Sequence, residues 1–428
     1  MLMTVGKTWL VLCVAVAVVA CGVLPVASGL PDSVVDALAR APFHVDAESL
    51  LSPPGELVMD VHNEYPWLNA EEAEAVASLM FNRKLLAPEE EEAAVAPTEA
   101  MPSLSAAINC PRLTPRAPPA DVGSVKPVDI VAMGAIGDSY TTASNAKSSN
   151  WLNMKWYPGL SWAMGADADT VTAFNIMRAV ARPDVAGGSI GVGDASSNMF
   201  NNRAVGGAIV QDMVAQANEL VATFKSSMNT TQYVNGWKTV NVFIGGNNLC
   251  KVCDSYSSNS PPVYEDNLRA ALNVLATIPR SIVSVVPILD GTQLRHFPGP
   301  LNKIALGIVC PCFAGTNSDK IAATQKAINE YNDIMASLVD EFNAKTGADQ
   351  AFVIQPFLVG FELPSGNAGK AYLCTADSFH PSPLGHALFG TGLWNNMIEP
   401  VGAKSRLSTS TTIKCPTDAD FIYTPKST

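Results

Sequence analysis

Two short polar segments, far apart in the sequence, contain residue types that carry out nucleophilic catalysis. The first is the Gly-Asp-Ser sequence at residues 137–139, which follows a run of apolar residues; the second is Asp-Ser-Phe-His at residues 377–380. In a tight turn, a carboxylate three residues before a histidine can accept the Nδ1 proton, which leaves Nε2 to take a proton from a serine hydroxyl. The spacing therefore predicts Ser139 as nucleophile, His380 as base and Asp377 as the residue that orients the base.

The chain has only five histidines, which narrows the choice of a base. His44 and His62 lie in the N-terminal part of the chain, and His296 lies in a stretch rich in proline and glycine. His386 falls within a predicted helix, where packing or solvent exposure is the expected role. His380 is therefore the best candidate.

Two glycine-rich segments are candidates for the donors that acyl transfer needs to stabilise an oxyanion. Residues 245–248 follow a predicted strand and include Asn247, and residues 202–207 lead through Gly207 into a helix. Glycines let backbone amides approach a ligand closely, although ordinary glycine turns are the alternative interpretation. Residues 187–191 match the Gly-x-Ser-x-Gly pattern, but both flanks have loop composition, so we expect a loop there and not a nucleophile elbow.

Alternating strand and helix patterns would position these segments. Apolar runs of strand length lie at residues 128–136, 237–244, 281–289 and 352–357. Helical patterns lie at residues 209–221, 320–342 and 383–398. Such alternation predicts a parallel sheet covered by helices on both faces. Because ligands of such sheets bind at the carboxyl ends of the strands, the candidate residues are expected to meet at one edge.

Charge is distributed unevenly along the 428 residues. The chain has 27 basic and 39 acidic residues, a net charge of −12, and residues 30–110 alone contain 15 acidic and three basic residues. Nucleic acid is an unsuitable partner for a chain with this balance, because few cations are available to replace its counterions. Residues 30–108 are interpreted as an acidic, partly helical pre-segment and linker, either a pro-region that covers the site or a solubilising arm.

The first 29 residues have the pattern of a secretory signal peptide. Lys7 precedes an apolar stretch at residues 9–19, and Val-Ala-Ser at residues 26–28 forms a small-residue cleavage site. A membrane helix and a lipoprotein signal at Cys21 are the alternatives, and the apolar stretch is short for a bilayer. We therefore expect a secreted protein with no transmembrane anchor after signal removal.

Seven cysteines remain beyond the signal, which favours disulfides with at least one cysteine left over. They are Cys110, Cys250, Cys253, Cys310, Cys312, Cys374 and Cys415. The two close pairs at residues 250–253 and 310–312 match zinc-ligand spacing, but an oxidising compartment and the lack of a nearby histidine disfavour zinc. No metal or organic cofactor is predicted, and the sequence leaves the disulfide pairing open.

Four blocks in order resemble the SGNH, or GDSL, hydrolase superfamily, and in particular its phospholipase B type. The blocks are Gly137-Asp138-Ser139, Gly207 in an Asn-x-Ala-x-x-Gly context, Gly245-Gly246-Asn247, and Asp377 to His380. The resemblance covers roughly residues 110–424, and residues 109–428 are interpreted as the hydrolase domain. It implies a three-layer α/β/α fold with a flavodoxin-like parallel sheet of about five strands. It also implies an oxyanion hole formed by the amides of Ser139 and Gly207 and the side chain of Asn247.

Two residues depart from the pattern of this family. Asn248 stands where an aspartate is usual, which removes a carboxylate that would brace the oxyanion hole. Ser378 stands where a cysteine is often found, which suggests that a disulfide is rerouted to Cys374. Neither change removes Ser139, Asp377 or His380.

The resemblance implies a secreted serine ester hydrolase that cleaves acyl esters of phospholipids or lysophospholipids through an acyl-enzyme at Ser139. An acetylesterase for carbohydrates or small esters is the alternative on the same fold, and a catalytically inactive secreted binding protein is the alternative of another class. Trp151, Trp156 and Trp162 follow Ser139 and are typical either of a lipid-contacting surface or of core packing. The expected partners are a lipid or ester substrate and, transiently, a membrane surface or micelle.

Overall fold

The computed structural model describes residues 102–149, 154–298, 306–307, 309–314 and 317–427. The predicted signal peptide and nearly all of the acidic pre-segment lie outside the described residues. The end of the pre-segment is described, and there Ser105 donates from its backbone N–H to Asp169 Oδ1 at 2.8 Å and from Oγ to Asp169 Oδ2 at 3.2 Å. Residues 103–108 are thus attached to the body of the domain.

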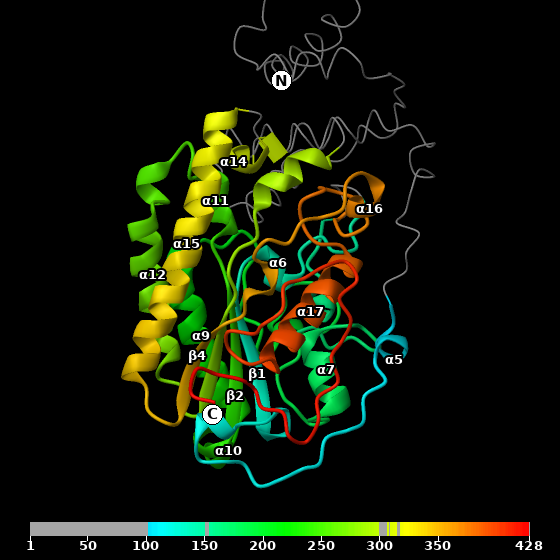
Figure 1. The fold of residues 1–428 in the computed structure, drawn as a ribbon, viewed down its shortest axis with the longest axis vertical. Helices are drawn as coiled ribbons and strands as arrows, with labels where there is room; N and C mark the ends of the chain where they lie inside the picture. Colours follow the sequence, from blue (N-terminus) through cyan, green and yellow to red (C-terminus); the bar gives the residue numbers. More distant parts are fainter. Residues whose placement is uncertain (1–101, 150–153, 299–305, 308, 315–316, 428) are drawn as a thin grey trace, which may run out of the picture.

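A parallel sheet with strand order β1-β2-β3-β4 lies at the centre of the domain (Figure 1). Nearly every residue of the four strands is buried, as expected for a sheet covered on both faces. The third strand is shorter than predicted because Pro287, which lacks a backbone N–H, follows it closely. The strands are β1 (Ile130–Gly137), β2 (Trp237–Phe243), β3 (Ser281–Val285) and β4 (Gln350–Ile354).

The prediction of about five strands is corrected to four in the part of the chain that the structure describes. The chain that runs along the outer side of β1 makes only two isolated parallel bridges to it, Ala132 to Ala186 and Ala135 to Asn202. Four glycines lie between these two contacts, and glycine weakens a strand because it costs backbone entropy and offers no side chain to pack. An irregular segment therefore occupies the place of the fifth strand, and β1 lies between it and β2, at the point where the strand order reverses.

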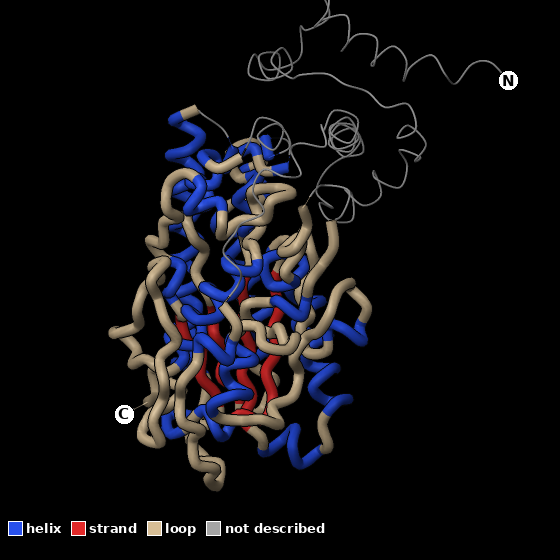
Figure 2. Tube along the Cα trace, turned by 90° about the vertical axis from the view of Figure 1, so that its right-hand side faces the viewer, coloured by secondary structure: helices blue, strands red, loops and turns tan. Residues whose placement is uncertain are grey.

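Helices cover both faces of the sheet (Figures 1 and 2). The long helices are α9 (Met213–Ser227), α12 (Pro261–Leu275) and α15 (Ser318–Lys345) on one face, and α7 (Ala173–Val180) and α17 (Pro383–Met397) on the other. The shorter α-helices are α5 (Leu104–Ala107), α6 (Ser139–Thr142), α8 (Ser196–Met199), α10 (Thr230–Asn235), α11 (Gly246–Lys251), α14 (Pro311–Ala314) and α16 (Asn367–Lys370). The predicted three-layer α/β/α architecture and its three long helical patterns are confirmed.

Three disulfides join distant parts of the domain: Cys110–Cys415, Cys250–Cys310 and Cys253–Cys312. The last two use all four cysteines of the alternative zinc interpretation, which is therefore wrong. The expected rerouting of a disulfide to Cys374 is also wrong. This thiol is buried and unbridged, and its Sγ lies 3.4 Å from the carbonyl oxygen of Ser148. Cys250 lies on α11 and Cys253 follows its last residue by two, so the last two disulfides connect the region of α11 to the segment that carries α14.

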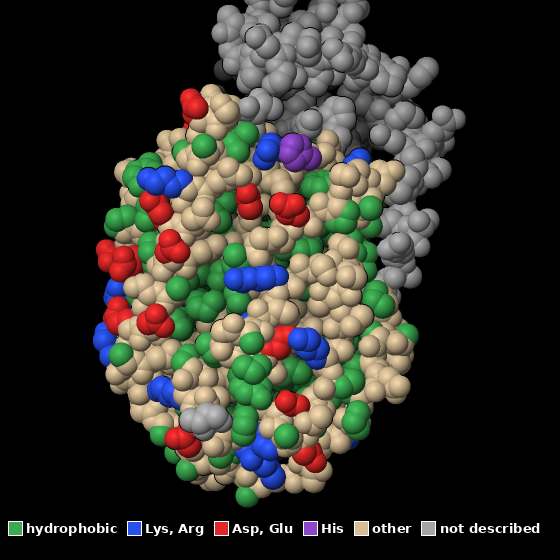
Figure 3. Space-filling view, in the orientation of Figure 1, with side chains coloured by type: hydrophobic (Ala, Val, Ile, Leu, Met, Phe, Trp, Pro, Cys, Tyr) green, Lys and Arg blue, Asp and Glu red, His purple; other side chains and the backbone are tan. Residues whose placement is uncertain are grey.

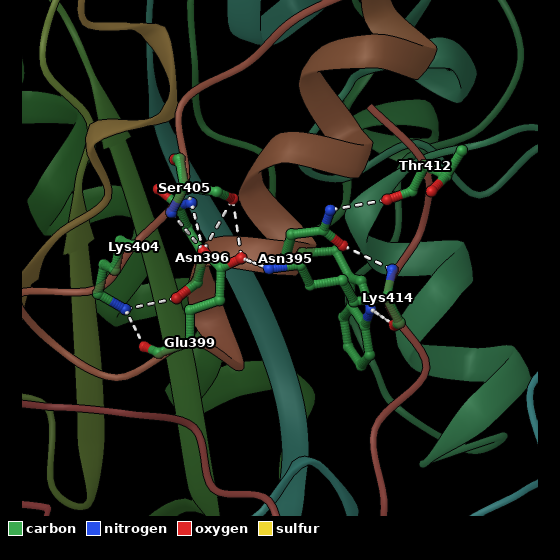
Figure 4. A network of polar contacts seen from close by, with 8 residues as sticks. Asn395, Asn396, Glu399, Lys404, Ser405, Thr412 and Lys414 are labelled. Atoms are coloured by element: carbon green, nitrogen blue, oxygen red, sulfur yellow. Dashed lines mark hydrogen bonds and ion pairs between the residues drawn. The ribbon is translucent and has the colours of Figure 1, made fainter. Parts of the chain in front are cut away.

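A polar network anchors the C-terminal tail to the end of α17 (Figure 4). The Glu399 carboxylate accepts hydrogen bonds from Asn396 and Ser405 and pairs with Lys414. Lys404 donates to the carbonyl oxygens of Asn396 and Glu399, and burial lowers the pKa of Lys404 to about 8. This network fixes one end of α17, whose other end directly follows the Asp377–His380 segment.

Charged side chains of both signs share the surface of the domain. On the face seen in Figure 3, Lys and Arg side chains are interspersed with Asp and Glu. Over residues 111–428 the sequence holds 24 acidic and 23 basic residues, so the electrostatic field of this part of the chain is of mixed sign. None of the helices in the described ranges combines the length and hydropathy needed to cross a bilayer.

Candidate active site

Ser139 is the first residue of α6, directly beyond the carboxyl end of β1. Asp138 caps this helix by accepting a hydrogen bond from the Tyr140 N–H at 3.0 Å. The turn needs glycine at position 137, because a Cβ there would lie 2.4 Å from the carbonyl oxygen of Phe243 on β2. A strand, a glycine and a capped helix turn thus place the Ser139 hydroxyl at the edge of the sheet where ligands bind.

The Asp377 carboxylate accepts four hydrogen bonds and orients His380. Its Oδ2 accepts from His380 Nδ1 at 2.7 Å and from Asn145 Nδ2 at 3.0 Å, and its Oδ1 accepts from the backbone N–H groups of Phe379 at 2.8 Å and His380 at 3.0 Å. Burial alone would raise the pKa of Asp377, but attraction to His380 and these hydrogen bonds lower it below the usual value. The carboxylate therefore stays ionised, and an Nδ1–H donor makes Nε2 the basic nitrogen of the His380 ring.

Two side chains from the segment after Ser139 contact the segment that carries the histidine. The Tyr140 hydroxyl donates to the carbonyl oxygen of Phe379 at 2.8 Å, and the Tyr140 and His380 ring centroids lie 5.8 Å apart. Asn145 reaches the Asp377 carboxylate, as described above. Burial, followed by the nearby carboxylates, raises the pKa of Tyr140, so its phenol remains a neutral donor. The structure thus packs the Ser139 turn against the Asp377–His380 turn.

Sequence patterns alone missed both Tyr140 and Asn145. Asn145 has a φ of 60°, a backbone conformation in which asparagine is enriched, so this residue type offered a weak local signal. The partner of each residue lies more than 230 positions away along the chain. Such pairings follow from the tertiary fold and not from local spacing.

Both candidate oxyanion segments reach the carboxyl edge of β1. Val205, two residues before Gly207, donates its N–H to the carbonyl oxygen of Gly137 at 3.2 Å. Asn247 belongs to the first turn of α11, and its Nδ2 donates to the carbonyl oxygen of Ala208 at 2.8 Å. Because a carboxamide nitrogen has two hydrogens, Asn247 can keep this bond and donate the second hydrogen to a ligand. The segments that carry Gly207 and Asn247 thus both reach this edge, and Asn247 lines one pocket with Ser139.

An apolar pocket adjoins Ser139 and Asn247. Phe313 of α14 forms one of its walls. It packs closely against Gly291, because a Cβ added to Gly291 would lie 2.2 Å from the Phe313 ring. The disulfides from Cys310 and Cys312 hold this wall against α11. The pocket is also lined by Phe243, Ile288, Leu289 and Phe379. Such walls would accommodate an apolar group of a ligand beside the Ser139 hydroxyl.

The chain is similar in sequence to a known family of hydrolases. A family model described as GDSL-like lipase/acylhydrolase matches residues 133–393, which is more than half of the chain. The chain belongs to the GDSL family. Among curated proteins, "phospholipase B1, membrane-associated" from human is 33% identical over 342 residues, covering 75% of this chain and 23% of the human protein. The rat protein of the same name is 34% identical over 328 residues, covering 72% of this chain and 22% of the rat protein. The chain thus spans less than a quarter of the length of these relatives.

Asn248, where this GDSL chain departs from the family pattern, makes three side-chain hydrogen bonds. Asn248 Oδ1 accepts from the Val210 N–H at 2.9 Å, and Nδ2 donates to Gln211 Oε1 at 3.1 Å and to Asn259 Oδ1 at 3.0 Å. A carboxylate could accept the first bond but could not donate the other two. The Asn248 side chain therefore joins α11 to the chain that follows Gly207 through Val210 and Gln211.

The tryptophans after Ser139 do not form one belt. Trp162 is fully buried and packs edge-on against Phe243, with ring centroids 5.8 Å apart. Trp156 is half-buried, and Trp151 lies outside the described residues. For Trp162 the core interpretation is confirmed, and the interfacial one is wrong, because composition alone cannot distinguish an aromatic ring in the core from one at the surface.

His386 is a buried histidine near His380, as its position in α17 requires. Among the described residues neither of its ring nitrogens has a hydrogen-bond partner, and the side chain is buried. Burial, and secondarily the proximity of His380, lowers the pKa of His386 to about 3. The His386 ring is therefore neutral at working pH, and the prediction of a packing role agrees with its burial.

This burial predicts a pH-dependent loss of stability that His386→Leu removes. The pKa of an unfolded histidine is near 6.5, so between about pH 6.5 and pH 3 the unfolded chain binds a proton that the folded chain excludes. The free energy of unfolding should therefore decrease as the pH is lowered through this window, by up to about 1.4 kcal/mol per pH unit. Urea titrations of both proteins from pH 7 to pH 4 measure this slope. Equal slopes in the wild type and the variant would contradict the assignment.

Proposed function

We propose that this chain is a secreted serine ester hydrolase that cleaves acyl esters of phospholipids or lysophospholipids through an acyl-enzyme at Ser139. The observation that carries the proposal is the contact of two turns. One bears Ser139, and the other bears a histidine whose Nδ1 is bonded at 2.7 Å to a buried carboxylate. Membership of the GDSL family and similarity to proteins named phospholipase B1 support the same activity.

In the proposed mechanism, Ser139 Oγ attacks the ester carbonyl carbon while His380 Nε2 takes the hydroxyl proton. Asp377 stabilises the imidazolium that forms, because its Oδ2 accepts the Nδ1–H. The carbonyl oxygen becomes an oxyanion, which the amides of Ser139 and Gly207 and the Asn247 side chain would stabilise. As the tetrahedral species collapses, the bond to the alcohol oxygen breaks and His380 returns its proton to the leaving alcohol. Water, deprotonated by His380, then attacks the acyl-enzyme and releases the acid.

The lining of the pocket beside Ser139 favours an apolar acyl group. Phe243, Ile288 and Phe313 line its walls with hydrocarbon, so burial of acyl carbon against them would stabilise the bound ester. An acetylesterase for carbohydrates or small esters is the second candidate on the same fold. The third, an inactive binding protein, is disfavoured because Ser139, His380 and Asn247 are all present.

The compartment and domain limits remain part of the proposal. Residues 1–29 are proposed to direct export, residues 30–108 to form an acidic pre-segment, and residues 109–428 to form the hydrolase domain. Three disulfides are compatible with an oxidising compartment. Transient contact with a membrane surface or micelle follows from the proposed lipid substrate.

A panel of substrates tests this proposal directly. Purified protein is incubated with diacyl phosphatidylcholine, lysophosphatidylcholine, triglyceride and an acetylated sugar, and the released acid is quantified by mass spectrometry. We expect fatty acid from the phospholipid or lysophospholipid at rates well above acetate release. Acetate release alone would favour the carbohydrate esterase, and no turnover of any ester would favour the binding protein.

Loss of the Asn247 side chain should reduce the rate of the acylation step. Asn247→Ala removes one donor aimed at the oxyanion, and loss of such a donor typically lowers kcat about 100- to 1,000-fold. KM should change little, because the bond strengthens only as charge develops on the oxygen. Steady-state kinetics with a soluble ester measure the two constants. A rise in KM with unchanged kcat would show that Asn247 binds the ground state and does not stabilise the oxyanion.

A further inference from the structure

Exposed hydrophobic side chains are concentrated in one loop region. Among the described residues, seven large hydrophobic side chains are exposed, and four of them fall within residues 190–205. These four are Ile190, Val192, Phe200 and Val205, with exposed fractions of 40–49%. The other three, Val234, Tyr256 and Val401, are far apart in the sequence. We call the four side chains the 190–205 patch.

Hydrogen bonds join the two halves of the 190–205 patch. Ile190 donates its N–H to the carbonyl oxygen of Asn198 at 2.8 Å, and Asn198 Nδ2 donates to the carbonyl oxygen of Val192 at 2.8 Å. Asn198 belongs to α8, which ends directly before Phe200. The residues at 190 and 192 therefore lie beside the helix that leads to Phe200.

The patch is continuous with the edge that carries the nucleophile. Arg203 donates its N–H to the carbonyl oxygen of Ala135 at 2.8 Å, and Val205 donates to Gly137 at 3.2 Å. Gly137 precedes Ser139 by two residues, and Val205 precedes Gly207 by two residues. An object that touches the patch would therefore lie beside the proposed reaction site.

The backbone holds Phe200 outward in an unfavourable conformation. Phe200 has a φ of 47° and a ψ of −116°, a combination that is rare for a bulky residue. Its neighbours fix this conformation: the Arg203 guanidinium donates to the carbonyl oxygen of Phe200, and Asn201 Nδ2 donates to the carbonyl oxygen of Met133 at 2.9 Å. The ring is nevertheless 43% exposed, so packing in the core does not account for this conformation.

The charge of the region indicates what kind of surface it fits. Between residues 187 and 207 the only charged residues are Asp194 and Arg203, one of each sign, and the rest are small, polar-neutral or apolar. A partner that binds through charge would find no complementary field here. A neutral lipid surface fits better, because an aromatic ring and aliphatic side chains enter the interface without needing ion pairs.

We infer that the 190–205 patch inserts into the surface of a zwitterionic phospholipid aggregate and so presents the Ser139 edge to lipid. This inference rests on the proposed function for its choice of lipid as the partner. It assigns the interfacial contact to Ile190, Val192, Phe200 and Val205, in place of the tryptophans that follow Ser139 in the sequence.

The test compares two double variants, each of which replaces two exposed hydrophobic side chains with polar ones. Val192→Ser with Phe200→Asn removes the centre of the patch, and asparagine tolerates positive φ. Val234→Ser with Val401→Ser removes two side chains of similar exposure elsewhere, and Val234 lies on α10, which leads into the opposite end of β2. Binding is measured by co-sedimentation with phosphatidylcholine vesicles, and catalysis with a soluble butyrate ester.

The patch variant should bind vesicles about tenfold or more weakly, since Phe and Val burial accounts for that much affinity. It should hydrolyse the soluble ester within twofold of the wild type, and 1 M NaCl should not weaken vesicle binding by the wild type. The control variant should bind as the wild type does.

Four results would overturn the inference: unchanged vesicle binding by the patch variant, an equal loss in the control variant, salt-sensitive binding, or a dimer that the patch variant converts to a monomer. Failure of the proposed function would give a different result from these four. The wild type would then hydrolyse neither the phospholipid nor the soluble butyrate ester, while the patch variant would still lose vesicle binding.

Discussion

Replacing Ser139 with alanine should abolish ester hydrolysis, with kcat falling about a million-fold. The variant lacks the oxygen that forms the acyl-enzyme, so only the residual effect of the oxyanion donors would remain. The fold should persist, because Asp138 caps α6 and Tyr140 binds Phe379 without the Ser139 hydroxyl. The measurement is kcat on a soluble ester, together with the melting temperature.

Ser189 provides a matched control for this substitution. It lies in the Gly-x-Ser-x-Gly sequence, is fully buried, and donates its hydroxyl to the carbonyl oxygen of Pro158 at 2.8 Å. Ser189→Ala should therefore cost about 1 kcal/mol of stability and retain turnover. If Ser139→Ala retained turnover and Ser189→Ala lost it, the nucleophile assignment would be wrong.

Asp377→Asn should lower kcat about 10,000-fold while leaving the backbone of the turn in place. Oδ1 accepts two backbone N–H groups, so an asparagine would keep its oxygen there and place its NH₂ group where Oδ2 now faces His380 Nδ1. His380 Nδ1 would then have to accept a hydrogen bond from this NH₂ group. The ring proton would move to Nε2, so the nitrogen that faces the nucleophile would no longer be basic.

The control for Asp377→Asn is Asp129→Asn, at the opposite end of β1. Asp129 is also buried, and it pairs with Arg116 at 2.6 Å. Its loss should lower the melting temperature with kcat nearly unchanged. The contrary result, an equal loss of kcat in both variants, would mean that a general loss of fold explains the effect at Asp377.

Local sequence patterns located the four described strands and the close pair of Asp377 and His380. Because parallel strands end at one edge of the sheet, the residues that follow two such strands, Ser139 and Asn247, are predicted to lie at the same edge. The Asp377–His380 contact follows from a three-residue separation. These features depend on neighbours in the chain or on a general rule of topology.

Features that depend on distant pairing could not be predicted in this way. The spacing of the cysteines left several pairings open, and only the approach of α14 to α11 determines that Cys250 pairs with Cys310. Within the described residues, the segment beside β1 forms isolated bridges and not a strand, and the effect of its glycines on pairing depends on the whole segment. Asn145 shows the same limit, because its partner Asp377 lies 232 positions away.

The central claim is that Ser139 is a nucleophile activated by the Asp377–His380 pair, and a fluorophosphonate probe tests it most directly. Folded protein is labelled, digested and examined by mass spectrometry. We predict a single covalent adduct on Ser139, which is lost in Ser139→Ala and strongly slowed in His380→Ala. An adduct on another serine, or no adduct in folded protein, would contradict the account.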